Sequence, residues 1–154
     1  MVSCSLHRYV LSTYVHSNMT ATLSPEFVAA REAFAQWYDS KDADTQELID
    51  SIAERTSFII DEEEYDAFIN QLELLSITNA AEFEDAFYAE YEYIGERITA
   101  KFAEDLCDDV YPTDELPDVY KYAIDYQLVW YSMLRHDFYD LEFKGNTYIF
   151  NRNY

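Results

Sequence analysis

Carboxylates dominate the chemistry that this sequence can do. The chain has 31 Asp and Glu against 10 Lys and Arg in 154 residues, a formal net charge of −21 at pH 7. Most of these acids gather in three runs, which comprise Asp61, Glu62, Glu63, Glu64, Asp66, Glu82, Glu84, Asp85, Glu90, Glu92, Glu96, Glu104, Asp105, Asp108, Asp109, Asp114, Glu115 and Asp118. Helical carboxylates three or four residues apart have Cβ atoms about 5–6 Å apart. This interval approaches the spacing of phosphates along one DNA strand, so the runs predict a surface that imitates duplex DNA.

The size of the charge supports the same interpretation. B-DNA carries one charge per roughly 1.7 Å of axis, so a charge of −21 corresponds to about 36 Å of duplex, or roughly ten base pairs. A compact domain of this length has a radius of gyration of about 15 Å, so its diameter is comparable to that length of duplex. Solubility requires a net charge of only about 2–8. Because so acidic a chain repels nucleic acid and anionic membranes, we expect its partner to be a protein with a basic cleft.

Other chemistries lack their usual residue patterns. Two glycines in the whole chain cannot build a glycine-rich phosphate loop. Calcium loops beginning at Asp39 or Asp42 lack oxygen ligands or glycine where the EF-hand requires them. Cys4 and Cys107 show no metal or redox spacing, and the three histidines show no nucleophile–base spacing. We therefore expect no enzymatic activity, no catalytic residue, no metal and no cofactor.

The composition nevertheless predicts a folded, cytoplasmic protein. Hydrophobic residues make up 49% of the chain and aromatic residues 18%, enough for a core. No signal-peptide pattern and no apolar stretch of membrane-spanning length is present. Acids are absent before about residue 24, which sets residues 1–23 apart as an N-terminal strand or extension. We expect a helical region over 24–78 and an acidic helical region with a C-terminal hairpin over 79–154.

Apolar spacing and capping residues predict an α+β fold that is mostly helical. Helices are expected from Pro25, over about 45–59, after Asp61, after Asn79 and over 98–110, with a long helix over 117–134. The helix after Asn79 is expected to carry Phe83, Phe87 and Tyr91 on one face. Residues 138–143 and 147–152 predict a β-hairpin around a glycine-containing loop. Residues 1–23 favour a strand only weakly over a short helix.

The order of several motifs in residues 79–154 is similar to that of a known family. The acidic and aromatic segment Glu82–Tyr91 is followed by Phe102–Leu106. Leu116 and Pro117 precede the triplet Ile124, Asp125 and Tyr126, and the chain closes with Gly145–Phe150 and Arg152. In this order and spacing the chain resembles the ArdA antirestriction proteins of plasmids, transposons and phages. Residues 1–60 lack the family's N-terminal pattern, which implies a shortened or divergent relative.

The resemblance implies a protein that occupies the DNA groove of type I restriction-modification enzymes. It implies carboxylates that imitate bent duplex DNA, an elongated homodimer and a bacterial host cytoplasm. Leu116, Pro117, Ile124, Asp125 and Tyr126 would be its antirestriction motif. Two other readings stay open: an acidic module that regulates another basic host protein, such as a polymerase, nucleoid protein or anti-phage nuclease, and an enzyme or calcium-binding protein.

Overall fold

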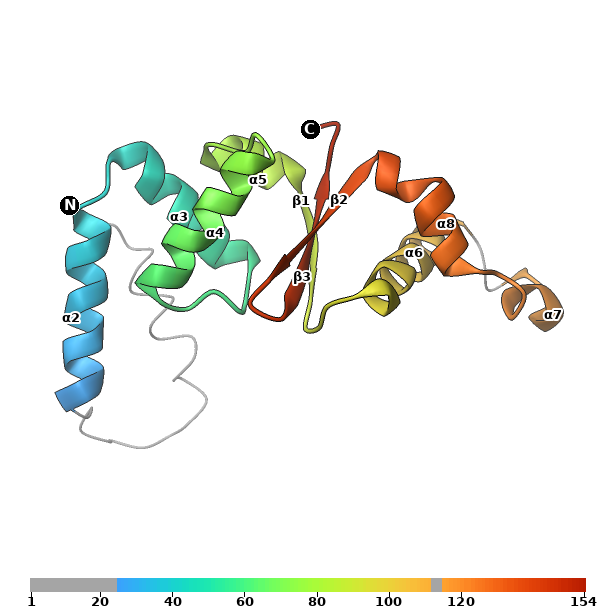
Figure 1. The fold of residues 1–154 in the computed structure, drawn as a ribbon, viewed down its shortest axis with the longest axis horizontal. Helices are drawn as coiled ribbons and strands as arrows, with labels where there is room; N and C mark the ends of the chain where they lie inside the picture. Colours follow the sequence, from blue (N-terminus) through green and yellow to red (C-terminus); the bar gives the residue numbers. More distant parts are fainter. Residues whose placement is uncertain (1–24, 112–114) are drawn as a thin grey trace. The chain divides into compact units, whose positions relative to one another are not determined.

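The computed structural model describes residues 25–111 and 115–154, which fold into two compact units (Figure 1). The first unit ends at Glu84 and the second begins at Asp85. The described residues form seven α-helices, one 3₁₀-helix and a three-stranded antiparallel sheet. This confirms the α+β, mostly helical fold class. The predicted N-terminal strand lies outside the described residues.

The first unit consists of helices that begin at polar caps. They are α2 (Pro25–Asp39), α3 (Ala43–Arg55), α4 (Glu62–Leu74) and α5 (Ala80–Ala86), the last running on into the second unit. The side chains of Asp42, Asp61 and Asn79 accept the backbone N–H of the residue three positions later at 2.9–3.0 Å. Each therefore satisfies a donor that the first turn of a helix leaves open. The predicted caps of α4 and α5 are confirmed.

Helix α3 is shorter than predicted. The chain turns to extended backbone at Thr56, whose hydroxyl donates to the Ile52 carbonyl at 2.8 Å. The expected helix over 45–59 is therefore wrong in its last turn, because a β-branched residue with its own backbone bond competes with the helix there. Ile59 still becomes completely buried, from a loop. The buried apolar residues of this unit are Tyr38, Leu48, Ile49, Ile52, Ile59, Tyr65, Phe68, Leu72, Ile77 and Phe83.

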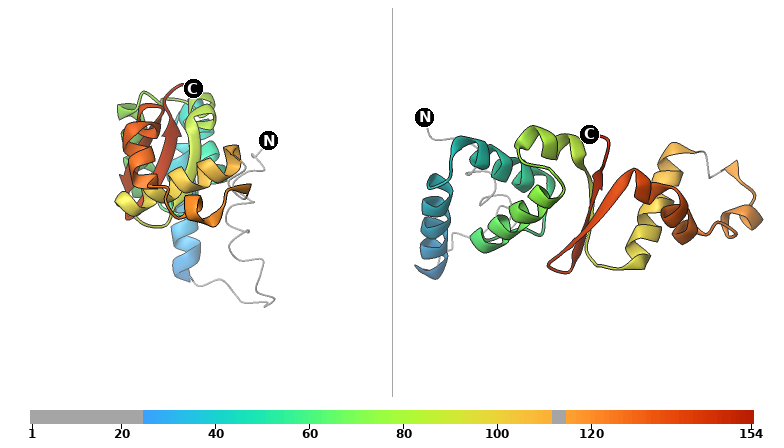
Figure 2. Two further views of the ribbon diagram at one scale, coloured as in Figure 1. Left: turned by 90° about the vertical axis from the view of Figure 1, so that its right-hand side faces the viewer. Right: turned by 45° about the horizontal axis from the view of Figure 1, so that its top comes forward.

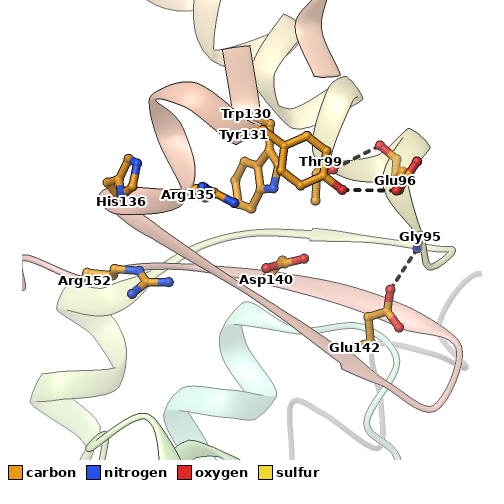
Figure 3. A pocket seen from close by; sticks show the side chains of 10 residues that line it. All are labelled: Gly95, Glu96, Thr99, Trp130, Tyr131, Arg135, His136, Asp140, Glu142 and Arg152. Carbon is orange, nitrogen blue, oxygen red and sulfur yellow. Dashed lines mark hydrogen bonds between the residues drawn. The ribbon is translucent and has the colours of Figure 1, made fainter. Parts of the chain in front are cut away.

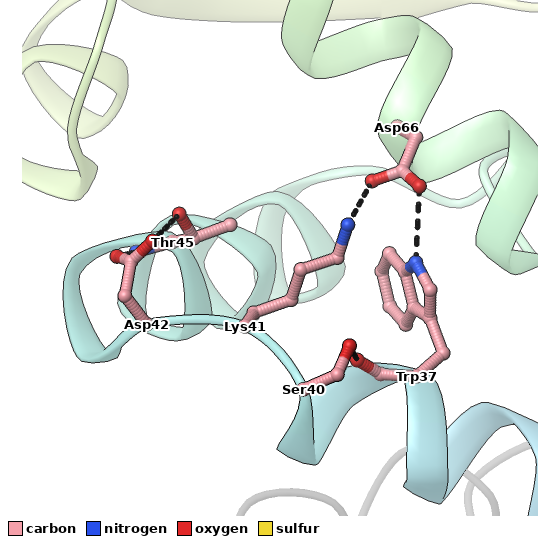
Figure 4. A network of polar contacts seen from close by, with 6 residues as sticks. All are labelled: Trp37, Ser40, Lys41, Asp42, Thr45 and Asp66. Atoms are coloured by element: carbon pink, nitrogen blue, oxygen red, sulfur yellow. Dashed lines mark hydrogen bonds and ion pairs between the residues drawn. The ribbon is translucent and has the colours of Figure 1, made fainter.

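Asp66 on α4 binds the C-terminal end of α2 (Figure 4). Its two carboxylate oxygens accept from the Trp37 indole at 3.0 Å and from the Lys41 ammonium at 2.6 Å. The Lys41 ammonium also lies 4.9 Å from the centre of the Trp37 ring. Although partial burial acts to raise it, these bonds hold the pKa of Asp66 below its usual value. This predicted surface acid therefore joins two helices of the scaffold.

The second unit packs helices against one face of its sheet (Figures 1 and 2). Its elements are β1 (Phe87–Tyr91), α6 (Glu96–Val110), α7 (Asp118–Lys121), α8 (Tyr126–Ser132), the 3₁₀-helix η2 (Leu134–His136), β2 (Phe138–Phe143) and β3 (Asn146–Asn151). The strand order is β1-β3-β2. Strands β2 and β3 are the predicted hairpin, joined at Lys144 and Gly145, both at positive φ. Positive φ at both positions suits the twist of a two-residue hairpin turn.

The segment Phe87–Tyr91 forms a strand, so the helix predicted after Asn79 is wrong beyond Ala86. Ala89 lies opposite Ile149 of β3, and the Phe87 and Phe150 rings meet edge to face at 5.7 Å. A helical spacing of four also fits a strand, because residues two apart share a strand face. Pairing with β3, more than 50 residues away in sequence, decides between the two.

The long helix predicted over 117–134 is also wrong, because the segment is divided into α7, α8 and η2. The side chain of Asp125 accepts the Leu128 N–H at 3.0 Å and so starts a new helix inside the predicted one. Val119 and Tyr122 are 70% and 90% exposed. Without a buried face, little packing energy is available to hold one continuous helix.

An aromatic cluster joins α6, α8 and the sheet. Phe102 is 1% exposed. The centre of its ring lies 5.0 Å from that of Phe138, 5.5 Å from that of Tyr88 and 5.9 Å from that of Trp130, each pair edge to face. Ala103 and Ile149 complete the buried cluster. Such pairs add about 0.5–1.5 kcal/mol each beyond the burial of their area. The cluster therefore fixes which face of α6 points to solvent.

Candidate functional site: acidic surfaces of the two units

Both units are strongly acidic when each is taken by itself. Residues 1–84 contain 16 Asp and Glu against four Lys and Arg, a formal charge of −12. Residues 85–154 contain 15 against six, a formal charge of −9. Either charge exceeds what solubility requires of a small domain, about 2–8 in magnitude.

The predicted acids lie at the surface throughout the described residues. The exposed ones are Asp61, Glu63, Glu84, Asp85, Glu92, Glu96, Asp108, Asp109, Glu115 and Asp118. Those of intermediate exposure are Glu62, Glu64, Asp66, Glu82, Glu90, Glu104 and Asp105. Asp114 lies outside the described residues. None of the described members of the set is buried, although Asp66, Glu104 and Asp105 form ion pairs with lysines.

Several of these acids are held in place by backbone bonds in the first unit. The Glu64 carboxylate accepts the Ile60 N–H at 3.1 Å, while Asp61 accepts the Glu64 N–H. The same reciprocal pattern occurs one helix later, where Glu82 accepts the Thr78 N–H at 2.7 Å and Asn79 caps the helix. Both arrangements are close to a capping box. They fix the direction of carboxylates that would otherwise rotate freely.

A second group of carboxylates in the first unit lines a hollow of about 290 Å³. Glu47, Asp50 and Glu54 contribute from α3, and Glu84 contributes from α5, where it accepts the Ser51 hydroxyl at 2.9 Å. Glu84 belongs to the predicted set of surface acids, whereas the three acids of α3 do not. Their spacing of three and four residues, which places them on one helix face, was the available signal.

Asp50 is a source of electrostatic strain in this hollow. It accepts the Tyr38 hydroxyl at 3.0 Å, and burial raises the pKa of Tyr38 to about 12, with the bond to Asp50 adding to the effect. Burial also raises the pKa of Asp50, and the negative charges of Glu54 and Glu47 raise it further. The hydrogen bond from Tyr38 lowers it, but by less than the other effects raise it. A raised folded-state pKa means that the ionised carboxylate destabilises the fold, and that stability is regained as the pH falls through that pKa.

We therefore expect Asp50→Asn to stabilise the protein at pH 7. The amide oxygen can still accept a hydrogen bond from the Tyr38 hydroxyl. The substitution removes the charge repulsion of Asp50 with Glu47 and with Glu54, each of which costs about 0.2–0.5 kcal/mol. The free energy of unfolding, measured by urea denaturation, should rise by about 0.5–1 kcal/mol. The gain should shrink toward acid pH, where wild-type Asp50 becomes neutral.

Asp44→Asn on the same helix is the matched control for this prediction. Asp44 is exposed in the first turn of α3, where a negative charge favours the helix dipole. Its neutralisation should leave stability unchanged or lower it slightly. A lower stability of Asp50→Asn at pH 7 would show that Asp50 acts mainly as an ionised hydrogen-bond acceptor.

In the second unit, acids follow the outer side of α6. Lys101 pairs with Asp105 at 2.5 Å and with Glu104 at 3.3 Å, and Asp105 also accepts the Tyr91 hydroxyl at 3.1 Å. One turn later, Asp108 and Asp109 are exposed. Burial raises the pKa of Tyr126, and the nearby Asp108 and Glu104 raise it further. The C-terminal half of α6 is thus a strongly negative surface held on a rigid helix.

The motif residues of the resemblance lie in the segment after α6 that ends with the first residue of α8. Leu116 is 39% exposed, Pro117 precedes α7, and Ile124 is half-buried. Asp125 caps α8, and Tyr126 packs against the aromatic cluster. Asp125 and Tyr126 therefore have a clear structural role in this chain.

Neither a metal cluster nor a membrane-spanning helix occurs in the part of the chain that the structure describes. Among residues 25–111 and 115–154, no group of three or more His, Cys, Asp or Glu side chains has a geometry suited to a metal ion. None of the helices in these residues combines the length and apolar character needed to cross a membrane. Comparison of the chain with models of protein families, with curated proteins and with solved structures finds no match in any of the three.

Proposed function

We propose that this protein is a DNA mimic that inhibits a DNA-binding enzyme, with a type I restriction-modification enzyme as the favoured target. The protein would enter the basic cleft of the enzyme and exclude DNA without catalysing a reaction. The observation that carries the proposal is the surface position of every described acid in the predicted set, on units with formal charges of −12 and −9.

The rigidity of the acidic helices supports this proposal. Capping bonds orient acids on α4 and α5, and the aromatic cluster holds α6. Binding by a preorganised array avoids the ordering cost that a disordered acidic tail incurs. The acids would replace phosphates in the cleft, so association should be fast and strongly weakened by salt.

A competition assay tests the proposed function directly. The protein is titrated into a purified type I restriction-modification enzyme with a fluorescent duplex that carries its site, and duplex release and DNA cleavage are followed. We expect displacement of the duplex, loss of cleavage, and an inhibition constant that rises steeply between low and physiological salt. Unchanged cleavage with saturating protein would refute the favoured target. Binding to a polymerase, a nucleoid protein or an anti-phage nuclease instead would support the regulatory module.

Salt should also stabilise the protein itself. Self-repulsion among so many surface carboxylates opposes the compact state, and added salt screens it. We expect the melting temperature at pH 7 to rise with NaCl concentration, by roughly 2–4 °C for each kcal/mol of repulsion relieved in a chain of this length. Thermal unfolding followed by circular dichroism measures this. A flat or falling response would mean that the acids are compensated in the folded state.

A further inference from the structure

The second unit contains a cleft of about 500 Å³ that carries both signs of charge (Figure 3). It lies between the start of α6, the end of α8 with η2, and strand β2. In Figure 3, the side chains of Arg135 and Arg152 lie on one side of the cleft, near His136, and we call the two arginines the cationic end. Glu96, Asp140 and Glu142 lie in the middle and on the other side, and we call them the acidic end. Trp130 and Tyr131 form an aromatic wall.

Both arginines of the cationic end are held in position by contacts that leave their charge available. The Arg135 guanidinium lies 5.7 Å from the centre of the Tyr131 ring. The Arg152 guanidinium lies 3.7 Å from the centre of the Tyr139 ring, and its Nε donates to the Phe138 carbonyl at 2.9 Å. Stacking orients a guanidinium while its other N–H groups stay able to bind a carboxylate.

The acidic end is similarly arranged. Glu142 accepts the Gly95 N–H at 3.0 Å, and Glu96 accepts the Tyr131 hydroxyl at 3.1 Å, so both carboxylates are fixed across the cleft. Asp140 lies between them and the cationic end and has no ion pair within 4.0 Å among the described residues. Burial raises the pKa of Asp140 and Glu142 raises it further, although Arg152 acts in the opposite direction. A cation placed beside Asp140 would therefore be stabilised.

The charge of the whole chain restricts which ligand can use this cleft. A charge of −21 repels anions such as nucleotides, in spite of the two arginines. A simple cation satisfies only the acidic end. A ligand that carries a carboxylate and a separate cationic group satisfies both ends, and a net positive charge lets the surrounding field attract it. A cleft of this volume lies within the range of about 300–1,000 Å³ that is common for small-molecule sites.

We propose that this cleft binds a small molecule of the basic amino-acid class, with its carboxylate at the cationic end and its distal cation at the acidic end. The aliphatic stem of the ligand would lie along the aromatic wall. The proposal stands independently of DNA mimicry, because it concerns a separate ligand and a direct binding measurement.

Isothermal titration calorimetry of the full chain with L-arginine tests the site, and two analogues test its two ends. Agmatine keeps the distal cation but lacks the carboxylate, and citrulline keeps the carboxylate but lacks the distal cation. We expect saturable binding of arginine, with each analogue at least about fivefold weaker. Agmatine has the larger positive charge, so attraction by the general field alone would make it bind more tightly than arginine, which would overturn the proposal.

Four variants locate the site. Asp140→Asn should weaken both arginine and agmatine at least about fivefold, whereas Arg135→Gln should weaken arginine but leave agmatine unchanged. Glu92→Gln and Arg97→Gln, exposed positions that do not line the cleft, should change neither affinity by more than about twofold. NMR of labelled protein should show arginine-dependent shifts at Gly95, Thr99 and Asp140, and unchanged folds for the variants. Equal binding by all four variants, or no saturation by about 10 mM arginine, would refute the site.

Discussion

Replacing Glu104, Asp108 and Asp109 of α6 by their amides is expected to weaken inhibition of the target enzyme at least about tenfold at low salt, which corresponds to about 1.4 kcal/mol. Under the proposed function, each of these carboxylates stands for one phosphate. Because fewer opposite charges meet in the complex, the slope of log affinity against log salt should also become less steep for the triple variant. The competition assay at several salt concentrations measures both effects.

Asp105 stays unchanged in this variant because it has a structural role. Its carboxylate binds both Lys101 and the Tyr91 hydroxyl, so its neutralisation would disturb the contact between α6 and β1. Asp108 and Asp109 are exposed and Glu104 is half-exposed, so the triple variant should keep the melting temperature of the wild type or exceed it.

A second triple variant separates the position of the charges from their number. Glu26→Gln, Glu32→Gln and Glu73→Gln remove the same three charges from exposed positions outside the predicted surface. This control should lose less than about threefold in inhibition. Equal losses in the two variants would mean that net charge, and no particular surface, determines binding.

Substitution of Phe102 by alanine should abolish inhibition without changing a single charge. Phe102 is 1% exposed and contacts Tyr88, Trp130 and Phe138. Truncation of a buried phenylalanine costs about 3–5 kcal/mol, much of the stability of a small domain. For a unit of this size the melting temperature should fall by roughly 12–40 °C, since each kcal/mol corresponds to about 4–8 °C.

The comparison with Phe102→Leu shows whether the packed scaffold is required. Leucine restores most of the lost volume, so this variant should keep the fold and most of the inhibition. Circular dichroism should show a loss of structure for the alanine variant at 37 °C, in parallel with its loss of inhibition. Full inhibition by an unfolded Phe102→Ala chain would mean that a disordered acidic polymer is sufficient, and the proposed preorganisation would be wrong.

Local chemistry made several elements of the fold predictable. Asp61 and Asn79 were identified as caps because a short polar side chain satisfies the open N–H groups of a first turn, and both accept the expected bond. Helix α6 follows from the apolar spacing of its residues, and the hairpin follows from alternation around Gly145, which takes the positive φ that its turn requires. These signals act over a few residues and do not depend on the rest of the chain.

The end of α3 was a local error, but the two larger errors arose where tertiary contacts decide the local conformation. Phe83, Phe87 and Tyr91 have a helical spacing, yet β3 pairs with Phe87–Tyr91 and converts it to a strand. Asp125 lies inside an apolar run, yet it caps α8, and Val119 and Tyr122 before it are largely exposed. In both places the local helix propensity is weak, and tertiary contacts override it.

The same division applies to the candidate sites. Composition alone determined that this chain is acidic and apolar enough to fold, because charge and apolar content sum over residues whatever their arrangement. Only the tertiary structure decided which carboxylates are bound by the scaffold, as Asp66 is, and which face solvent. It also brought Arg135, Asp140 and Glu96 to one cleft, since the position of a side chain in space depends on how strands and helices pack and not on its place in the chain.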